Sequence, residues 1–224
     1  MGFISVAVDG PSGAGKSTVA RAAAERLGFV YVDTGAMYRS IGLAVCRRGV
    51  AEEDTAGILE ALPGMEISLR YEEGAQHVLL NGEDVSDAIR TPQIAQYASK
   101  VSAVPEVRRF LLNLQRDMAT KNNIIMDGRD IGTVILPDAP VKIFLTASAA
   151  CRAERRYKEL LEKGQQVTFD GVLADIVRRD LQDSLRAVAP LKQADDAVLL
   201  DTSKLTLEQS IDAVLQIIHE KMKG

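Results

Sequence analysis

Short, continuous apolar runs alternate along this chain with longer segments of helical periodicity. The runs show almost no alternation of apolar and polar positions, which is typical of strands buried on both faces of a parallel sheet. They cover residues 3–8, 29–32, 124–126, 141–145 and 197–200. Runs of this kind separated by helical patterns predict an α/β chain with a parallel sheet.

The helical segments carry their own start and stop signals. Residues 16–27 have a helical period and are followed by Gly28, a residue suited to the left-handed conformation that closes many helices. Residues 205–221 contain Thr206 with Gln209 three positions later, the pattern of a capping box. These signals predict one helix directly after the first strand and another at the end of the chain.

A long insertion separates the second predicted strand from the third. The interval between residues 32 and 124 is far longer than one crossover helix needs. Asn81-Gly82 follows an apolar run and favours a type I′ hairpin turn. We therefore predict a small antiparallel lobe over residues 64–90, followed by helices that start near Pro92 and Pro105, where no amide hydrogen is needed.

Composition places the chain among ordinary globular proteins. Of its 224 residues, 46% are hydrophobic and 26% charged, which excludes a disordered chain, a collagen and a disulfide-rich miniprotein. The formal net charge of −4 offers no electrostatic footprint for duplex nucleic acid. Cys46 and Cys151 lie in predicted helices without metal-ligand spacing, so we expect both to be reduced packing residues.

No segment of the sequence predicts contact with a membrane. No apolar run approaches the ~20 residues that a membrane-spanning helix requires. Asp9 interrupts the first apolar stretch and no basic segment precedes it, so no signal peptide is predicted. We expect a cytoplasmic protein.

The most specific motif is a phosphate loop between the first strand and the first helix. The sequence Gly-Pro-Ser-Gly-Ala-Gly-Lys-Ser at residues 10–17 fits the pattern G-x-x-x-x-G-K-[ST] in its required context. Its backbone N–H groups can converge on phosphate oxygens at the helix N-terminus. We expect Lys16 to reach the β and γ phosphates of a nucleoside triphosphate, and the Ser17 hydroxyl to hold Mg²⁺. The residues predicted to bind this nucleotide are Gly10, Pro11, Ser12, Gly13, Ala14, Gly15, Lys16, Ser17 and Thr18.

Two acidic residues follow predicted strands close to this loop. Asp127 ends the apolar run at 124–126, as the acid of a Walker B strand does, and is a candidate for orienting the metal or its waters. Asp9 directly precedes the loop and is equally open to a role near the metal and to a structural role in the turn.

Arginines in the second half of the chain indicate where a phosphorylated acceptor binds. Arg152, Arg155 and Arg156 have helical spacing and are predicted to share one face, ahead of a polar segment suited to a mobile flap. Arg179 and Arg186 are predicted to share a face of the next helix. Asp183 would then lie between these two cations.

Ion pairs on a solvated helix surface are the ordinary interpretation of such charges. Two features favour phosphate binding instead. Basic residues outnumber acidic ones between residues 151 and 192, although the whole chain is acidic. Arginine is also used where lysine would serve for helix pairing, as planar recognition of phosphate prefers.

Four segments resemble the signature sequences of the bacterial cytidylate kinase family. They are the loop at residues 10–17, Asp-Thr-Gly-Ala-Met-Tyr-Arg at 33–39, Asp-Gly-Arg-Asp-Ile-Gly-Thr-Val at 127–134, and Arg-Ala-Val-Ala-Pro-Leu at 186–191. The similarity runs nearly end to end. It implies a P-loop nucleoside monophosphate kinase fold, in which helices flank a five-stranded parallel sheet and an antiparallel β lobe and a helical lid are inserted.

The resemblance also implies a division of the chain into three parts. They are a P-loop core at residues 1–33, 104–150 and 171–224, a nucleoside monophosphate lobe at 34–103 with the antiparallel insertion at 64–90, and a lid at 151–170.

The same resemblance implies the residues of the acceptor site. Ser99, Arg108 and Asp130 would face the cytosine ring, which needs both an acceptor and donors opposite it. Without the family, Asp130 fits a turn or helix cap, and nothing else singles out Ser99 or Arg108. Asp183 and Arg179 would meet the pentose. The full set implied to bind the substrate is Thr34, Arg39, Ser99, Arg108, Arg129, Asp130, Arg179, Asp183 and Arg186, with Thr34 standing where many members have Ser.

The implied reaction is transfer of the ATP γ-phosphoryl group to CMP or dCMP, giving ADP and CDP or dCDP. The acceptor phosphate is already anionic, so we expect electrostatic catalysis without a protein base. The candidate catalytic residues are Lys16, Arg129, Arg155 and Arg186.

Two alternatives remain open at this point. The first is a kinase of another small acceptor, such as UMP, AMP, shikimate or a coenzyme A precursor, and the second is a non-catalytic nucleotide-binding regulator. For the favoured interpretation we expect a monomer whose partners are ATP, CMP and dCMP, with no nucleic acid or membrane partner.

Overall fold

The computed structural model describes residues 2–72 and 75–223, which form two compact units. Unit 1 consists of Met1–Tyr31 and Asn122–Gly224, and unit 2 of Val32–Lys121. Unit 2 is therefore an insertion in unit 1, between the second and third strands of the main sheet. The insertion that the strand spacing predicted is confirmed.

The core of unit 1 is a five-stranded parallel sheet in the order β2-β6-β1-β7-β8. In register, Val6 pairs with Ile125 on one side and with Val141 on the other. Each predicted strand is found within two residues of its expected ends. The strands are β1 (Ser5–Asp9), β2 (Val30–Asp33), β6 (Ile124–Gly128), β7 (Val141–Thr146) and β8 (Val198–Asp201).

The prediction that every strand is buried on both faces is wrong for β8. This strand lies at the sheet edge and pairs only with β7. Its residues alternate between half-buried and exposed, and Leu199 is 57% exposed. An apolar run shows that its residues can be buried. Whether they are buried depends on which helices and loops cover the two faces of the strand.

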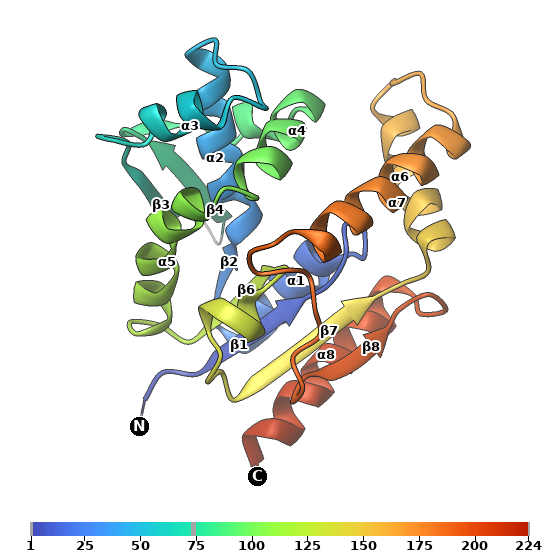
Figure 1. Ribbon diagram of the computed structural model, residues 1–224. Helices are drawn as coiled ribbons and strands as arrows, with labels where there is room; N and C mark the ends of the chain where they lie inside the picture. The colour runs from blue at the N-terminus through green and yellow to red at the C-terminus, as the bar shows by residue number, and fades with distance from the viewer. Residues whose placement is uncertain (1, 73–74, 224) are drawn as a thin grey trace. The chain divides into compact units, whose positions relative to one another are not determined.

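Two helices cover one face of the sheet, α1 (Lys16–Leu27) and α8 (Leu207–Lys223) (Figure 1). They pack on Val6, Val8 and Ile143 in the main apolar cluster. Both of their predicted terminal signals are confirmed. Gly28 closes α1 at φ 66°, and before α8 the Thr206 amide donates to Gln209 Oε1 at 2.9 Å while the Gln209 amide donates to Thr206 Oγ1 at 3.2 Å.

Two further helices of unit 1 pack against each other, α6 (Ala149–Glu162) and α7 (Phe169–Leu185). Their contact is a small apolar cluster that includes Ala153, Leu160 and Ile176. A single π turn, η2 (Ile131–Ile135), follows β6. These elements bring most of the predicted arginines into unit 1.

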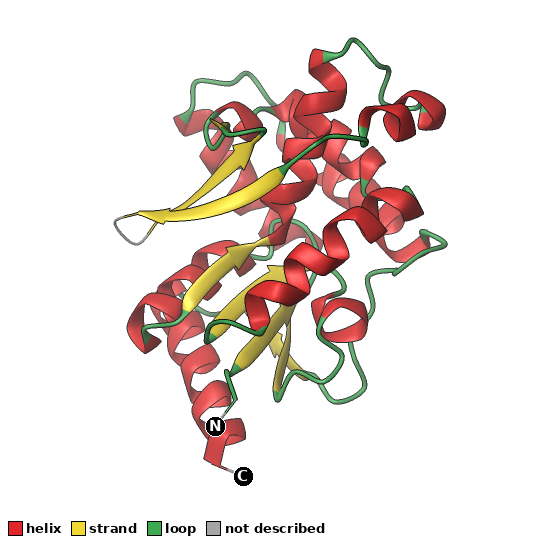
Figure 2. Cartoon of the chain, turned by 90° about the vertical axis from the view of Figure 1, so that its left-hand side faces the viewer, coloured by secondary structure: helices red, strands yellow, loops and turns green. Residues whose placement is uncertain are grey.

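Unit 2 combines helices with a three-stranded antiparallel sheet, β3-β4-β5 (Figure 2). Asn81 and Gly82 both have positive φ, at 51° and 83°, which confirms the tight turn between β4 and β5. Pro92 and Pro105 begin α4 and α5 as predicted. The elements are α2 (Thr34–Arg47), α3 (Thr55–Ala61), β3 (Ile67–Glu72), β4 (Ala75–Leu80), β5 (Glu83–Asp84), η1 (Ala88–Arg90), α4 (Pro92–Val101) and α5 (Pro105–Ala119).

The two units do not coincide with the predicted core, lobe and lid. Residues 104–121 belong to unit 2, whereas the prediction assigned them to the core. The functional division stays a prediction. Cys46 and Cys151 are free thiols, as expected. Within residues 2–72 and 75–223, none of the helices has the length and apolar character needed to cross a bilayer.

Candidate functional site

The phosphate loop is shaped by backbone that only glycine tolerates. Gly10 has φ 147°, and a Cβ atom there would lie 1.9 Å from the carbonyl oxygen of Leu145 in β7. Gly15 adopts the left-handed conformation at φ 89° directly before α1 begins. The sequence therefore folds into a compact turn that presents the first amides of α1, which is a site suited to anions.

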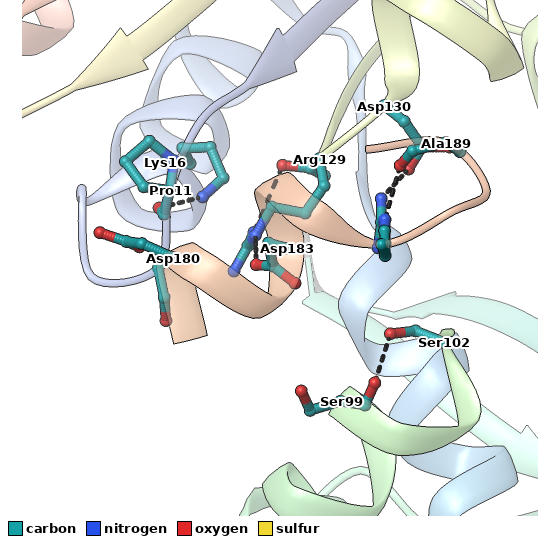
Figure 3. A network of polar contacts seen from close by, with 12 residues as sticks. Pro11, Lys16, Ser99, Ser102, Arg129, Asp130, Asp180, Asp183 and Ala189 are labelled. Carbon is teal, nitrogen blue, oxygen red and sulfur yellow. Dashed lines mark hydrogen bonds and ion pairs between the residues drawn. The ribbon is translucent and has the colours of Figure 1, made fainter. Parts of the chain in front are cut away.

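Lys16 is the cation of this loop. Its side chain is buried, and its ammonium donates to the carbonyl oxygen of Pro11 at 2.8 Å (Figure 3). Burial, together with the nearby Arg129, lowers the pKa of Lys16 to about 7. A buried cation beside another cation is stabilised by an anion, so the loop fits a polyphosphate.

Ser17 and Asp127 form an oxygen pair at the start of α1 and the end of β6. The Ser17 hydroxyl donates to Asp127 Oδ2 at 2.9 Å, and the Tyr31 hydroxyl donates to Asp127 Oδ1 at 2.7 Å. Hydroxyl and carboxylate oxygens are ligands that Mg²⁺ prefers, with phosphates and water completing its shell. In the described part of the chain no three His, Cys, Asp or Glu residues gather as a metal cage. The pair fits a Mg²⁺ ion that arrives with a nucleotide.

Tyr31 is a site residue that the sequence analysis missed. It lies in the apolar run that forms β2, where a buried tyrosine requires a hydrogen-bond partner for its hydroxyl. That requirement was the available signal, but it did not identify Asp127 as the partner.

The sequence left two roles open for Asp9, one near the metal and one structural. The hydrogen bonds of its side chain support the structural role. Its two carboxylate oxygens accept hydrogen bonds from the amides of Ile131 and Gly132, each at 2.7 Å. Burial raises the pKa of Asp9 from 3.8 to about 6. Asp9 therefore ties the base of the phosphate loop to the η2 turn that follows Asp130.

Arg129 and Asp183 form one guanidinium–carboxylate pair of unit 1. Arg129, between β6 and η2, donates from Nε to Asp183 Oδ2 of α7 at 2.8 Å (Figure 3). The prediction that Asp183 lies between Arg179 and Arg186 on one helix face is wrong. The helix ends at Leu185, and Arg186 is extended, with φ −61° and ψ 140°.

Arg186 and Asp130 form the second pair. Arg186 donates from Nη2 to Asp130 Oδ1 at 3.3 Å and from Nε to the Ala189 carbonyl oxygen at 2.5 Å. Both side chains of the pair are buried. Asp130 makes no side-chain capping bond to η2, so the alternative interpretation as a cap is not supported.

Arg179, on α7, is half-buried, and burial lowers the pKa of its guanidinium. Among the residues that the structure describes, none forms a hydrogen bond or ion pair with this group. An arginine in this condition is suited to an anionic ligand.

The guanidinium groups of the three arginines of α6 bond to different partners. Arg152 is buried and forms a bidentate pair with Asp180 of α7, at 3.0 and 2.6 Å. It also donates to the carbonyl oxygens of Ser12, at 3.0 Å, and Ala147, at 2.8 Å. Four of its five N–H groups are thereby used, and Arg152 links the phosphate loop to α7.

The other two arginines of α6 have separate surroundings. Arg155 donates to the Thr202 carbonyl oxygen at 2.7 Å, and its guanidinium lies 3.4 Å from the carbonyl oxygen of Ala14 in the phosphate loop. Arg156 pairs with Glu159 at the surface, at 2.7 Å. The partners of Arg152 and Arg155 thus lie elsewhere in the chain, whereas that of Arg156 lies on α6 itself. Helical spacing did not predict these separate partners.

Asp180 was also missed by the sequence analysis. It lies between Arg179 and Asp183 in a charged segment of α7, and no local spacing connects it with Arg152, which is 28 residues earlier. Only the packing of α6 against α7 reveals the pair.

Two of the predicted lobe residues gather around Asp33 in unit 2. Asp33 Oδ1 accepts from the Ala36 amide at 2.9 Å and so caps α2, whose first residue is the buried Thr34. Asp33 Oδ2 accepts from Arg39 at 2.8 Å and from Arg90 at 3.2 Å. Burial alone would raise the pKa of Asp33, but the two guanidinium groups hold it below its ordinary value.

Arg39 carries an unused donor in this group. Its Nε is buried without a hydrogen-bond partner among the described residues. Arg90 and Asp33 were not predicted as site residues. The signal for Asp33 was its place as the N-cap of a helix, three residues before Ala36.

Ser99 and Arg108 lie in α4 and α5 of the same unit. Arg108 is buried, stacks over the Tyr38 ring at 5.5 Å from the ring centroid, and donates to the Ser102 carbonyl oxygen at 3.2 Å. The Ser99 carbonyl oxygen accepts from the Ser102 hydroxyl at 2.9 Å (Figure 3). Unit 2 therefore contains Thr34, Arg39, Ser99 and Arg108, and unit 1 contains the other predicted site residues.

Comparison with known proteins gives consistent results. Residues 6–220 match the model of the family described as "Cytidylate kinase". The "Cytidylate kinase" of Caldicellulosiruptor saccharolyticus is 48% identical over 97% of this chain and 96% of that protein. The "Cytidylate kinase" of Geobacter sulfurreducens is 49% identical over 98% and 94%.

One solved structure shows likeness of fold alone. An uncharacterized protein from Eubacterium ventriosum superposes with a TM-score of 0.54 at 14% identity, over 96% of this chain and 98% of that one.

Proposed function

This chain belongs to the cytidylate kinase family, and from this membership we propose that it transfers the γ-phosphoryl group of ATP to CMP or dCMP. The products are ADP and CDP or dCDP. One structural observation carries the proposal. In unit 1 the buried Lys16 of the phosphate loop lies near Arg129, and Arg129 is paired with the carboxylate of Asp183 in α7. Such an arrangement suits a donor polyphosphate and a second, phosphorylated ligand.

The donor ATP is bound by the loop amides and by Lys16. Ser17 and Asp127 supply the protein oxygens for Mg²⁺, directly or through its waters. The bound cation offsets charge on the donor phosphates. Burial disfavours the charged form of Lys16 and so lowers its pKa. A phosphate beside the ammonium group favours the charged form, because an anion compensates for the water that burial removes.

The acceptor nucleotide is bound by arginines that carboxylates orient. The pair with Asp183 fixes Arg129 through Nε, and its Nη2 has no partner among the described residues, so this group can donate to the α-phosphate. Arg186, Arg179 and Arg39 are proposed to join it. Asp183 also has an oxygen available for a pentose hydroxyl.

The cytosine ring is proposed to be bound by Asp130, Ser99 and Arg108. Asp130 supplies an acceptor for the exocyclic amino group, and Arg108 and Ser99 supply donors for the ring oxygen and nitrogen. Thr34 completes the proposed acceptor site with its hydroxyl. UMP has an oxygen in place of the amino group, so a carboxylate opposite it disfavours that acceptor.

Catalysis requires position and charge rather than a protein base. The acceptor oxygen is anionic before the reaction, and the cations Lys16, Arg129, Arg155 and Arg186 stabilise charge on the transferred group. The contact of Arg155 with the phosphate loop supports its place in this set. Arg152 is not proposed to touch phosphate, because its donors are used within the protein.

We propose that the chain acts as a monomer in the cytoplasm and that nucleotides are its only partners. The formal net charge of −4 favours small nucleotides in locally basic sites over binding to duplex nucleic acid.

The test is a coupled assay of ADP release with ATP and Mg²⁺. CMP, dCMP, UMP, AMP, shikimate and no acceptor are compared at equal concentration. We expect strong stimulation by CMP and dCMP alone. Stimulation by another acceptor would assign a different kinase activity, and slow ATP hydrolysis unchanged by every acceptor would favour the regulator.

A further inference from the structure

Lys142 is an unusual residue for an interior strand of a parallel sheet. It is the second residue of β7, and its side chain is only 8% exposed. The neighbours Val141 and Ile143 pack in the cluster with α1 and α8, so Lys142 points to the opposite face. Burying an ammonium group is costly unless it is paired, and apolar residues would fill such a position at lower cost.

The ammonium of Lys142 joins two segments that are distant in sequence. It bonds to both carboxylate oxygens of Asp196, at 3.0 and 2.7 Å, and to the carbonyl oxygen of Pro137. Pro137 lies just after η2, and Asp196 ends the segment of residues 186–196, which we call the Arg186 arm. One buried cation therefore ties the arm to the segment that follows η2.

The stem of Lys142 also supports η2 from below. A Cβ atom at Gly132 would lie 3.1 Å from Lys142 Cδ, so the glycine lets the stem pass directly beneath the turn. The amide of Gly132 donates to Asp9. The turn that begins just after Asp130 is thus held between Asp9 and Lys142.

The Arg186 arm has little packing of its own. A cavity of about 410 Å³ is lined by Gly132, Thr133 and Val134 on one side and by arm residues on the other. Within the arm, Ala189 has φ 50° although it precedes Pro190, which is a strained conformation for a residue other than glycine. Its carbonyl oxygen accepts from Arg186 Nε. A strained segment beside a cavity keeps its shape only if its ends are fixed.

We propose that Lys142 is a positioning residue for the acceptor site, because it anchors the Arg186 arm and η2 and thereby sets the geometry of the Arg186–Asp130 pair. Lys142 does not touch a substrate. This inference rests on the proposed function only in naming the ligand of Arg186 and Asp130. The anchoring itself is a property of the chain.

The test uses Lys142→Met, which keeps the stem and removes the charge. The matched control is Lys192→Met in the same arm, where the lysine is 71% exposed and lies 3.9 Å from Asp195. For Lys142→Met we expect KM for CMP to rise about tenfold while KM for ATP stays within about twofold. Lys192→Met is expected to match the wild type. An unchanged KM for CMP, or equal rises for CMP and ATP, would overturn the inference.

Substitution of Asp196 is a second test. It removes the same ion pair without changing a buried residue of the sheet. Its side chain is 63% exposed. Asp196→Asn is expected to raise KM for CMP in the same way, and Asp196→Glu to preserve the wild-type value. The double variant Lys142→Met/Asp196→Asn should be no worse than Lys142→Met alone, since both changes remove one interaction. Additive losses would show that the two residues act separately.

A measurement without catalysis separates this inference from the proposed function. The Leu191 amide of the arm donates to the Asp183 carbonyl oxygen at 2.8 Å. In Lys142→Met its hydrogen exchange is expected to be at least about tenfold faster than in the wild type, with amides of α1 unchanged. Unchanged protection of Leu191 would overturn the inference. A wild type that does not phosphorylate CMP would overturn only the proposed function.

Discussion

The proposed donor side and the proposed acceptor side of unit 1 are built in different ways. The phosphate loop relies on backbone amides fixed by glycines at sterically restricted positions, with Lys16 as its buried cation. The acceptor side relies on side-chain pairs between separate elements, Arg129 with Asp183 and Arg186 with Asp130. A backbone site depends on local sequence, whereas each side-chain pair depends on the packing of two distant segments. The first is visible in sequence, and the second is vulnerable to the loss of either partner.

The largest effect is expected on the donor side. Lys16→Ala should lower kcat about 10³-fold, because it removes the cation that faces the transferred phosphate. The fold should persist, since the change removes a charge whose burial is unfavourable. Steady-state kinetics and a thermal melt measure the two effects. Lys121→Ala, at a 70% exposed position, is the control. Turnover near the wild-type value in Lys16→Ala would contradict the role given to this residue.

On the acceptor side, Arg129→Ala should lower kcat/KM for CMP about 10²-fold and leave KM for ATP nearly unchanged. The change removes a phosphate donor and leaves the carboxylate of Asp183, 15% exposed, without its partner. Steady-state kinetics with each substrate varied in turn measures the split.

The double variant Arg129→Ala/Asp183→Ala sharpens this prediction. It should lose less than the sum of the two single losses, because the residues act as a pair. Equal losses for ATP and CMP in Arg129→Ala would argue against separate donor and acceptor sides.

An intermediate effect is expected where the two sides meet, at the Arg152–Asp180 pair. Asp180→Asn should lower the free energy of unfolding by about 2–3 kcal/mol, because it leaves buried Arg152 without its charged partner. It should also raise KM for ATP about threefold to tenfold, since Arg152 bonds to Ser12 of the phosphate loop.

Urea unfolding and steady-state kinetics provide these values. Asp175→Asn is the matched control on the same helix, with a side chain 61% exposed. If both variants behave alike, the Arg152–Asp180 pair contributes nothing to the free energy of unfolding or to ATP binding.

The smallest effect on activity is expected at Asp9, which causes a pH dependence of stability. Its pKa is raised from 3.8 to about 6 by burial, so between these pH values the folded chain holds a proton that the unfolded chain has lost. The free energy of unfolding should therefore fall as pH rises through this window, by about 3 kcal/mol over its full width. Below the window the carboxyl is protonated in both states.

Asp9→Asn removes this titration. The difference in unfolding free energy between variant and wild type should change across pH 4–6 in favour of the variant, as measured by urea unfolding. Asp195→Asn, at a side chain 97% exposed, should show no such window. A constant difference for Asp9→Asn would show that Asp9 ionises normally in the folded chain.

The sequence predicted those parts of the molecule that local rules determine. The five strands, the Asn81-Gly82 turn, the helices that begin at Pro92 and Pro105, and the capping box at Thr206 are confirmed. In each case a few consecutive residues carry the physical cause. The phosphate loop belongs to the same group, because steric limits at Gly10 and Gly15 are visible in the motif itself.

Side-chain partners could not be predicted in this way. Helical spacing placed Arg152 beside Arg155 and Arg156, yet its partner is Asp180 on another helix. The spacing of Asp183 and Arg186 assumed one continuous helix, which ends at Leu185 instead. Long flexible side chains choose partners through tertiary packing, and a spacing rule within one helix carries no information on the helix beside it.

The two points where unit 2 joins unit 1 determine how freely the length of unit 2 can change between related sequences. The chain departs after Tyr31 and returns at Asn122, and just inside these points the Val30 amide donates to the Asn123 carbonyl oxygen at 2.8 Å. For unit 1, residues 32–121 therefore act as one long loop whose two ends are held together by sheet pairing. Each doubling of a loop's length then costs only about 0.6 kcal/mol. Residues 32–121 could therefore be lengthened or replaced at little cost to the sheet that carries the phosphate loop.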